Sequence, residues 1–261
     1  MFDYHMHTTV SYDGHNTPEE MAQAAVTAGL REICFTDHLD YQLSVPREMT
    51  SYTPEAYRKA YEHLNIPGIT IRQGAEVGLT PWNKEEIIKD LQCFPYDFVL
   101  GSIHFINDED VYYPEFWAGR DFLVTERQYF EEMLRCVALH DDFDVLGHLT
   151  YISKVKGHPS PRIIPLEDHR DVIAAIMEAL ISKSKGMEVN TSGVDRCGDY
   201  LPGIPYLRLF KDLGGEILTV GSDAHTADRV GQYIGDACAM VKEIFGHVCT
   251  FQKRQPIFHK L

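Results

Sequence analysis

Residues 216–225 read EILTVGSDAH, a nearly continuous apolar run that ends in a glycine and a group of polar residues. A strand that lacks polar–apolar alternation is typical of a parallel sheet that helices cover on both faces. Amphipathic segments with helical spacing flank this run at residues 205–215 and 226–246. The stretch therefore predicts a parallel strand between two helices, the repeating unit of an α/β fold.

The same strand–loop–helix pattern recurs along the whole chain. The predicted strands occupy residues 2–5, 32–38, 69–78, 98–104, 144–149, 186–193 and 216–225. The predicted helices occupy residues 17–29, 53–64, 83–94, 125–140, 168–186, 205–215 and 226–246. Seven such units favour a closed, TIM-like (βα)7 barrel over an open sheet, and we expect residues 1–261 to form a single domain. Residues 248–259 either add a further strand or pack outside the barrel.

Capping signals set the boundaries of the first helices. Thr17 is the expected N-cap of the first helix, Glu20 completes a capping box, and Gly29 ends the helix. Thr53 and Asn83 are the expected N-caps of the next two helices.

The composition excludes several classes of protein. A net charge of −15 argues against binding a polyanion over a broad surface. No apolar run approaches the roughly 20 residues that span a bilayer, and the first residues do not resemble a signal peptide. With Met1 as the natural start, we expect a cytoplasmic protein. None of the six cysteines forms a short pair, which favours reduced thiols over disulfides or a zinc ribbon.

Nearly every predicted strand ends in side chains that can bind a metal. They are His5, His7, His38, Glu76, His104, His148, Asp223 and His225, with Asp13 in the loop after the first strand. In a parallel barrel the carboxyl ends of all strands meet at one rim, so these side chains should converge. One buried histidine or glutamate is more often a core residue, but burying so many titratable groups together would cost many kcal/mol unless cations paired with them. Imidazole and carboxylate without thiolate suit zinc, manganese or iron, and this number of ligands suits two or three divalent ions.

The chain resembles the polymerase-and-histidinol-phosphatase (PHP) family in seven segments, which follow the family order and cover almost the whole chain. They are HMHTTVSYDG (5–14), FTDH (35–38), GAEVG (74–78), GSIHF (101–105), VLGHLTYI (145–152), MEVNTSG (187–193) and GSDAH (221–225). Chain length, residues 7–14 and residues 221–231 are most similar to the histidinol-phosphatase branch, which dephosphorylates L-histidinol phosphate in histidine biosynthesis.

This resemblance implies a distorted (βα)7 barrel with a trinuclear metal site. The matching positions assign His5, His7, Glu76 and Asp223 to the first ion, Glu76, His104 and His148 to the second, and Asp13, His38 and His225 to the third. Some relatives carry histidine where this chain has Asp13, and aspartate is a harder ligand. The resemblance also implies phosphomonoester hydrolysis by a metal-bridging hydroxide, with His104, Glu76 and Asp223 as catalytic residues.

Arginine is well suited to hold the phosphate, because its planar fork matches phosphate oxygens. Arg162 and Arg196 lie in loops that should reach the rim, and Arg229 is a weaker candidate. The long loop 105–121 offers acidic and aromatic contacts for the cationic end of histidinol phosphate. Its candidates are Asp108, Glu109, Asp110, Tyr112, Tyr113, Glu115 and Trp117.

We therefore expect a metal-dependent phosphatase whose partner is a small phosphate ester, with no nucleic acid and no membrane as partner. One alternative is a PHP phosphoesterase that acts on a nucleotide or another small ester. The acidic charge and the lack of a basic stripe disfavour a nucleic-acid substrate. A second alternative is a non-catalytic metal-binding regulatory protein, which the number of candidate ligands disfavours.

Overall fold

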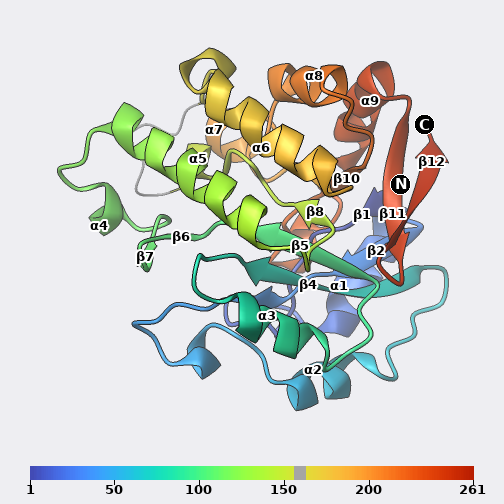
Figure 1. Ribbon diagram of the computed structural model, residues 1–261. Coiled ribbons are helices and arrows are strands. Elements are labelled where there is room, and N and C mark those ends of the chain that lie inside the picture. Colours follow the sequence, from blue (N-terminus) through green and yellow to red (C-terminus); the bar gives the residue numbers. More distant parts are fainter. Residues whose placement is uncertain (156–162) are drawn as a thin grey trace.

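A computed structural model, which describes residues 1–155 and 163–261, contains a nearly closed parallel barrel (Figure 1). Its strands, in spatial order, are β1 (Phe2–Asp3), β2 (Glu32–Phe35), β4 (Thr70–Gly78), β5 (Phe98–Ser102), β8 (Val145–Leu146), β9 (Gly186–Asn190) and β10 (Leu218–Gly221). The short β3 (His38–Leu39) also pairs with β4 in parallel. Hydrogen bonding between the first and last strands continues around the ring, because Tyr4 N donates to the Val220 carbonyl at 3.0 Å. The predicted TIM-like (βα)7 fold is confirmed.

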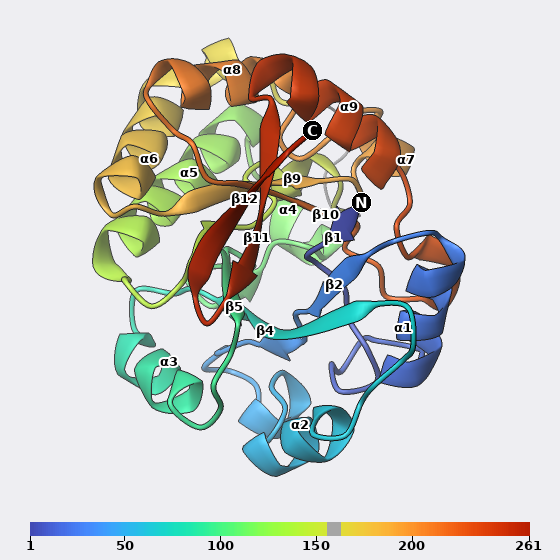
Figure 2. The same cartoon turned by 90° about the vertical axis from the view of Figure 1, so that its right-hand side faces the viewer.

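Helices surround the barrel (Figure 2). The longer ones are α1 (Pro18–Thr27), α2 (Pro54–Tyr61), α3 (Lys84–Leu91), α5 (Phe122–Leu139), α6 (Arg170–Ser182), α8 (Ile204–Asp212) and α9 (Ile234–Ile244). Two single-turn helices, α4 (Pro114–Trp117) and α7 (Val194–Cys197), lie in loops that follow β5 and β9. The hairpin of β6 (Phe105–Ile106) and β7 (Glu109–Asp110) precedes α4. Each helix in the described ranges is too short or too polar to cross a membrane.

The capping predictions hold at two helices and fail at the third. Thr17 and Glu20 form the reciprocal capping box of α1, and the Thr53 side chain accepts a hydrogen bond from Ala56 N. Asn83 does not cap α3 with its side chain. Its amide instead bonds to Gly78 O at 2.8 Å and to Thr80 N at 3.1 Å. This side chain fastens the loop that follows β4, so its polar atoms are already used.

The last barrel helix is shorter than its sequence pattern predicts. The periodic segment starts at residue 226, but α9 begins at Ile234. A 3₁₀ turn at Ala227–Arg229 and a positive φ of 59° at Tyr233 separate it from β10. The apolar spacing of residues 226–233 therefore reflects a packed loop rather than a helix.

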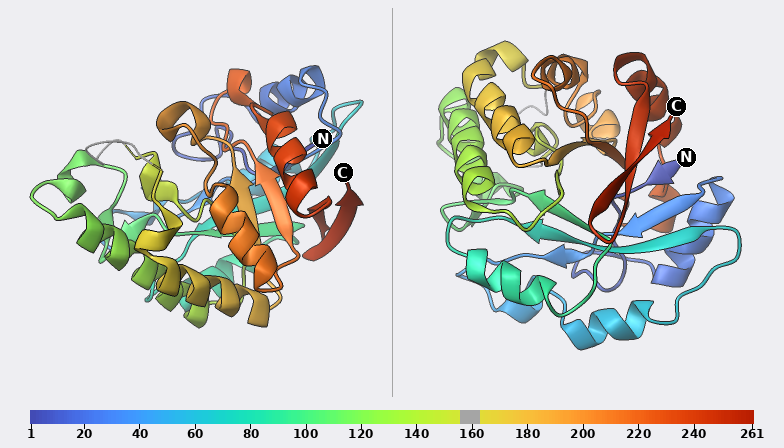
Figure 3. Two further views of the ribbon diagram at one scale, coloured as in Figure 1. Left: turned by 90° about the horizontal axis from the view of Figure 1, so that it is seen from above. Right: turned by 45° about the vertical axis from the view of Figure 1, so that its right-hand side comes forward.

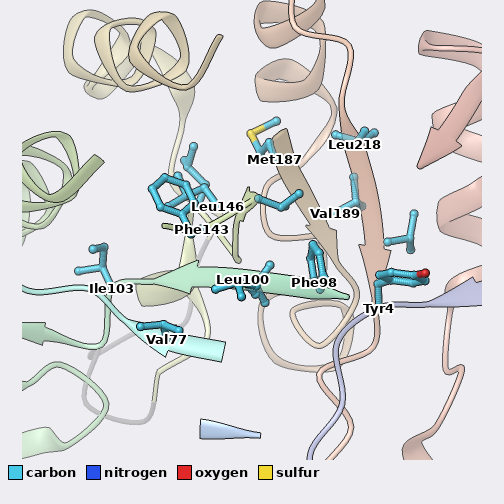
Figure 4. Packing of buried hydrophobic residues seen from close by; sticks show 14 of the residues in the cluster. Tyr4, Val77, Phe98, Leu100, Ile103, Phe143, Leu146, Met187, Val189 and Leu218 are labelled. Atoms are coloured by element: carbon cyan, nitrogen blue, oxygen red, sulfur yellow. The ribbon is translucent and has the colours of Figure 1, made fainter. Parts of the chain in front are cut away.

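The barrel interior changes from apolar to polar along β5. In β5, Phe98 and Leu100 are fully buried at alternate positions, as Figure 4 shows among the packed core residues. The next alternate positions are Ser102 and His104, whose side chains approach Glu76. Because alternate residues of a strand share a face, one strand supplies both core and site. The polar half of the barrel interior lies at the carboxyl end of this strand.

The C-terminal segment forms an antiparallel hairpin outside the barrel sheet, the second of the two predicted outcomes. Strands β11 (His247–Gln252) and β12 (Gln255–Lys260) lie across one end of the barrel (Figures 2 and 3). Phe251 packs on Phe98, the first residue of β5, with ring centroids 4.9 Å apart. The hairpin therefore covers the amino end of the barrel.

All six cysteines are free thiols, four of them buried.

Candidate metal centre and active site

Glu76, on β4, lies at the centre of the group of predicted ligands. Its Oε1 is 2.9 Å from His148 Nε2 and 3.5 Å from His104 Nε2. Its Oε2 is 3.2 Å from His5 Nε2 and 3.4 Å from His7 Nε2. The two oxygens of one buried carboxylate thus face two different groups of imidazoles, which is the arrangement of a bridging ligand.

The first group joins the two ends of the barrel sheet. His5 Nε2 and His7 Nε2 are 3.1 Å apart, and they lie 3.6 and 3.5 Å from Asp223 Oδ1. Asp223 has a positive φ of 55°, and its backbone N donates to the His5 carbonyl at 2.8 Å. The closing strand pair therefore places Asp223 opposite the two histidines.

The other predicted ligands form a neighbouring group. Asp13 Oδ2 is 3.1 Å from His225 Nε2 and 3.4 Å from His38 Nε2. His7 stacks on the rings of both His38 and His225 with centroids 4.2 Å apart. All nine predicted ligands are therefore brought together, and their function in metal binding stays a prediction.

Several buried atoms of this cluster have no hydrogen-bond partner in the described part of the chain. They are Asp13 Oδ1, His38 Nδ1, Glu76 Oε2 and His148 Nδ1. A buried polar atom without a partner costs about 1–3 kcal/mol, so such a group in a native fold requires a compensating interaction. Imidazole and carboxylate lone pairs that converge within 4.8 Å fit divalent cations.

A further layer of polar residues orients the histidines. The Nδ1–H of His5 donates to Glu188 Oε1 at 2.8 Å, which leaves its Nε2 lone pair directed at the cluster. In the same way, His104 Nδ1 donates to Asp40 Oδ1 at 3.0 Å. Sequence reasoning missed both carboxylates. Glu188 is a charge between two apolar residues of its strand and Asp40 follows His38 at i+2, so both signals were present in the sequence.

Position 221 requires a glycine because His5 and Glu188 lie very close to its backbone. A Cβ at this position would lie 2.3 Å from His5 Cβ and 2.4 Å from Glu188 Oε1. Any side chain would displace the pair that orients His5. The glycine that ends β10 is therefore part of the site.

Burial and neighbouring charges set the protonation of the cluster. Burial alone would raise the pKa of Glu76, but the neighbouring imidazoles of His5 and His38, which are cationic when protonated, outweigh it and hold this pKa well below its ordinary value. Burial, together with the neighbouring His225 and His38, lowers the pKa of His7 to about 3. Glu76 is therefore ionised and His7 neutral near neutral pH, the states in which each can bind a metal.

A cavity of about 470 Å³ opens onto the cluster and carries basic side chains on its wall. Predicted Arg196 lines it, as do Arg229 and Lys154. Lys154 bonds to Ser192 Oγ at 2.7 Å and also contacts Asp223, whereas Arg229 is held by Asp195 at 2.6 Å. Sequence reasoning missed Lys154, since one lysine in a loop gives no signal. Arg162 lies outside the described residues.

The acidic and aromatic candidates of the loop after β5 divide into two groups. Asp110, Tyr112 and Tyr113 line the cavity. Asp108, Glu109 and Glu115 line an adjoining hollow instead. Trp117 is wrong as a contact residue, because it is buried in the core and its indole N–H donates to the Val111 carbonyl.

Comparison with known proteins identifies relatives of one kind. The model of the PHP domain matches residues 3–192. A histidinol-phosphatase of Lactococcus lactis is 32% identical over 95% of this chain and 93% of its own length. A probable histidinol-phosphatase of Clostridium acetobutylicum is 27% identical over 97% of this chain and 98% of its own length.

The same likeness extends to solved structures. The crystal structure of histidinol phosphate phosphatase from L. lactis, complexed with zinc, L-histidinol and phosphate, superposes with a TM-score of 0.87. It is 29% identical and covers 98% of both chains. A putative histidinol phosphatase from Listeria monocytogenes shares the fold, with a TM-score of 0.72 and 18% identity over 91% of this chain and 100% of its own.

Proposed function

Because the chain belongs to the PHP domain family, we propose that it is a metal-dependent phosphomonoesterase that hydrolyses L-histidinol phosphate to L-histidinol and phosphate. The main support for this proposal is the buried Glu76. Its two carboxylate oxygens face separate groups of histidines beneath a cavity that basic side chains line in part. With this substrate, the enzyme acts in histidine biosynthesis and belongs in the cytoplasm.

The residues of the cluster have distinct proposed functions. His5, His7 and Asp223 would hold one ion, His104 and His148 a second, and Asp13, His38 and His225 a third, with Glu76 as a further ligand of the first two. Zinc, manganese and iron all suit these ligands. When bound, such ions supply Lewis acidity toward phosphate oxygens and lower the pKa of water.

The protein's own side chains complete the site. Arg196 and Lys154 bind the phosphate dianion and orient it over the cluster, because both line the cavity that opens there. Glu188 and Asp40 hold His5 and His104 in one tautomer and one orientation. The walls around Tyr151, which packs on His148 with ring centroids 4.7 Å apart, limit the access of bulk water.

A substrate panel with the metal-loaded protein tests this function. We expect kcat/KM for L-histidinol phosphate to exceed that for nucleoside monophosphates and glycerol phosphate by ~100-fold or more, which is about 2.7 kcal/mol of discrimination. A chelator should abolish turnover, and zinc, manganese or iron should restore it. Preference for a nucleotide would replace the proposed substrate, and zero turnover of every ester by a metal-replete sample would reject enzymatic function.

A further inference from the structure

A second hollow, of about 620 Å³, adjoins the cavity over the metal cluster. Tyr12, Asp110 and Tyr113 line both spaces and therefore mark the passage between them. Tyr12 comes from the loop after β1, and the other two residues come from the β6–β7 hairpin and the turn that follows it. A ligand that extends beyond the first cavity would pass these three side chains.

The two spaces differ in their basic side chains. Among the described residues, the first is lined by Lys154, Arg196 and Arg229 in addition to the histidines and to four carboxylates, Asp13, Glu76, Asp110 and Asp223. The second is lined by four carboxylates and by no lysine, arginine or histidine of the described chain. They are Asp108, Glu109, Asp110 and Glu115. This contrast suits a molecule that is anionic at one end and cationic at the other.

Most of these carboxylates already have partners or lie in solvent. Asp108 accepts hydrogen bonds from the backbone N–H groups of Leu43 and Ser44 at 2.5 and 2.9 Å. Glu109 forms an ion pair with Arg120 at 2.7 Å. Glu115 is exposed on α4.

Asp110 differs from the others in position and in partners. One of its oxygens accepts a hydrogen bond from Tyr112 N at 2.8 Å, and no basic side chain of the described ranges pairs with it. Burial raises the pKa of this carboxyl. A half-buried carboxylate with spare acceptor capacity, at the junction of the two spaces, has an electrostatic preference for a cation.

We propose that Asp110 binds the protonated amine of an amino-alcohol phosphate, and that the hollow beyond Tyr12 and Tyr113 receives the ring of the substrate. This proposal rests on hydrolysis of histidinol phosphate as the function. In that substrate the amine is on the carbon next to the ester methylene, so it lies close to the phosphate, as Asp110 lies on the wall of the phosphate cavity. Tyr113, with 54% of its surface exposed, adds an aromatic face for the cation or the ring.

The likeness to the L. lactis structure also supports a two-part ligand. That protein is complexed with both L-histidinol and phosphate, the two halves of the ester. A site that holds an alkyl amine beside phosphate needs a negative group near the phosphate cavity. In the described part of this chain, Asp110 is the carboxylate of the second hollow that also lines the first cavity.

The test compares Asp110→Asn with the wild type on two matched pairs of esters. The first pair is L-histidinol phosphate and glycerol phosphate, and the second is 2-aminoethyl phosphate and propyl phosphate, which differ in the ammonium group. We expect kcat/KM to fall about tenfold or more for both amines and to change less than about twofold for both neutral esters. By calorimetry, the Kd of L-histidinol should rise about tenfold, and that of inorganic phosphate should stay unchanged.

Glu131→Gln is the control, since it removes a carboxylate that pairs with Arg127 at 2.8 Å and that lines neither space. It should leave all four esters unaffected. Equal losses on amines and neutral esters in Asp110→Asn, or no loss on any ester, would overturn the proposal. If that variant does not fold, Tyr113→Leu supplies a second test, with an expected two- to fivefold loss confined to the amines. If the wild type does not hydrolyse histidinol phosphate but prefers 2-aminoethyl phosphate over propyl phosphate, the proposed function is refuted. The proposal that Asp110 binds the protonated amine of the substrate would then still stand.

Discussion

The two ends of the barrel differ in whether their buried polar groups form hydrogen bonds. At the amino end, the Tyr4 hydroxyl donates to the Glu32 carboxylate and accepts from Phe251 N at 3.0 Å. Asp144 there pairs with Arg254 at 2.5 Å. At the carboxyl end, Glu76 Oε2 and His148 Nδ1 are buried without a hydrogen-bond partner in the described chain.

We infer from this difference that the amino end of the barrel mainly stabilises the fold and that the carboxyl end mainly serves the proposed function. Satisfied polar groups and the packed hairpin at the amino end lower the free energy of the folded state. At the carboxyl end, unsatisfied polar atoms carry an energetic cost, which the proposed binding of cations would offset. Substitutions at the amino end should therefore change stability with little effect on rate, and substitutions at the carboxyl end should do the reverse.

His104→Ala provides the largest expected effect at the carboxyl end. The variant removes one of the two imidazoles that face Glu76 Oε1. We expect kcat to fall by about 1,000-fold or more, equivalent to about 4 kcal/mol, with the fold retained. Steady-state kinetics with added metal and thermal unfolding of the same sample measure both quantities.

His140→Ala is the matched control for that variant. His140 is also buried, but its Nε2–H donates to the Thr80 carbonyl at 2.8 Å and it does not line the cavity. Its loss should lower the Tm and leave kcat of the folded protein unchanged. A near-normal rate in His104→Ala would remove His104 from the catalytic residues.

Phe251→Ala tests the amino end. Phe251 is buried in the hairpin and packs on Phe98, so its removal leaves a cavity between the hairpin and the barrel. We expect the free energy of unfolding to fall by about 3–5 kcal/mol, measured by urea denaturation. Well below its melting temperature the variant should keep its kcat, whereas a large loss of kcat would show that the two ends are coupled.

Glu188→Gln tests the layer that orients the carboxyl-end histidines. Glutamine preserves the volume but removes the charge that holds the His5 Nδ1–H. Loss of such a partner weakens metal affinity by about 10–100-fold, and competition with a chromogenic chelator measures it. Glu32→Gln is the control at the amino end, where Glu32 pairs with Arg72 at 3.1 Å. An equal effect of both variants on metal affinity would contradict a specific role of Glu188.

The sequence predicts the two ends unequally, for physical reasons. Histidines at i and i+2, such as His5 and His7, give a strong signal because strand periodicity and ligand chemistry coincide. Asp110 and Lys154 reach the same cavity from a hairpin and a loop, and loop conformation has no such period. The hairpin was predicted only as two alternatives, since the apolar pattern of residues 248–259 does not specify its pairing partner.

The smallest expected effect concerns a histidine at the amino end. His259 Nε2 hydrogen-bonds with the Thr250 hydroxyl at 2.7 Å, and its ring lies 4.5 Å from that of Phe2. Burial lowers the pKa of this imidazole, so the folded state binds its proton less tightly than the unfolded state. Its contribution to stability is therefore full above the ordinary histidine pKa and is lost as the pH falls below that value.

His259→Gln should remove this part of the pH dependence, a difference of less than about 1 kcal/mol between pH 7.5 and 5.5 in urea unfolding, with kcat unaffected. An NMR titration of the wild type measures the same pKa directly. A value at or above the ordinary one would show that burial does not govern this site. In that case the hydrogen-bond partner of each histidine would decide its function. Thr250 would set the contribution of His259 to stability at the amino end, and Glu188 would set the proposed metal binding of His5 at the carboxyl end.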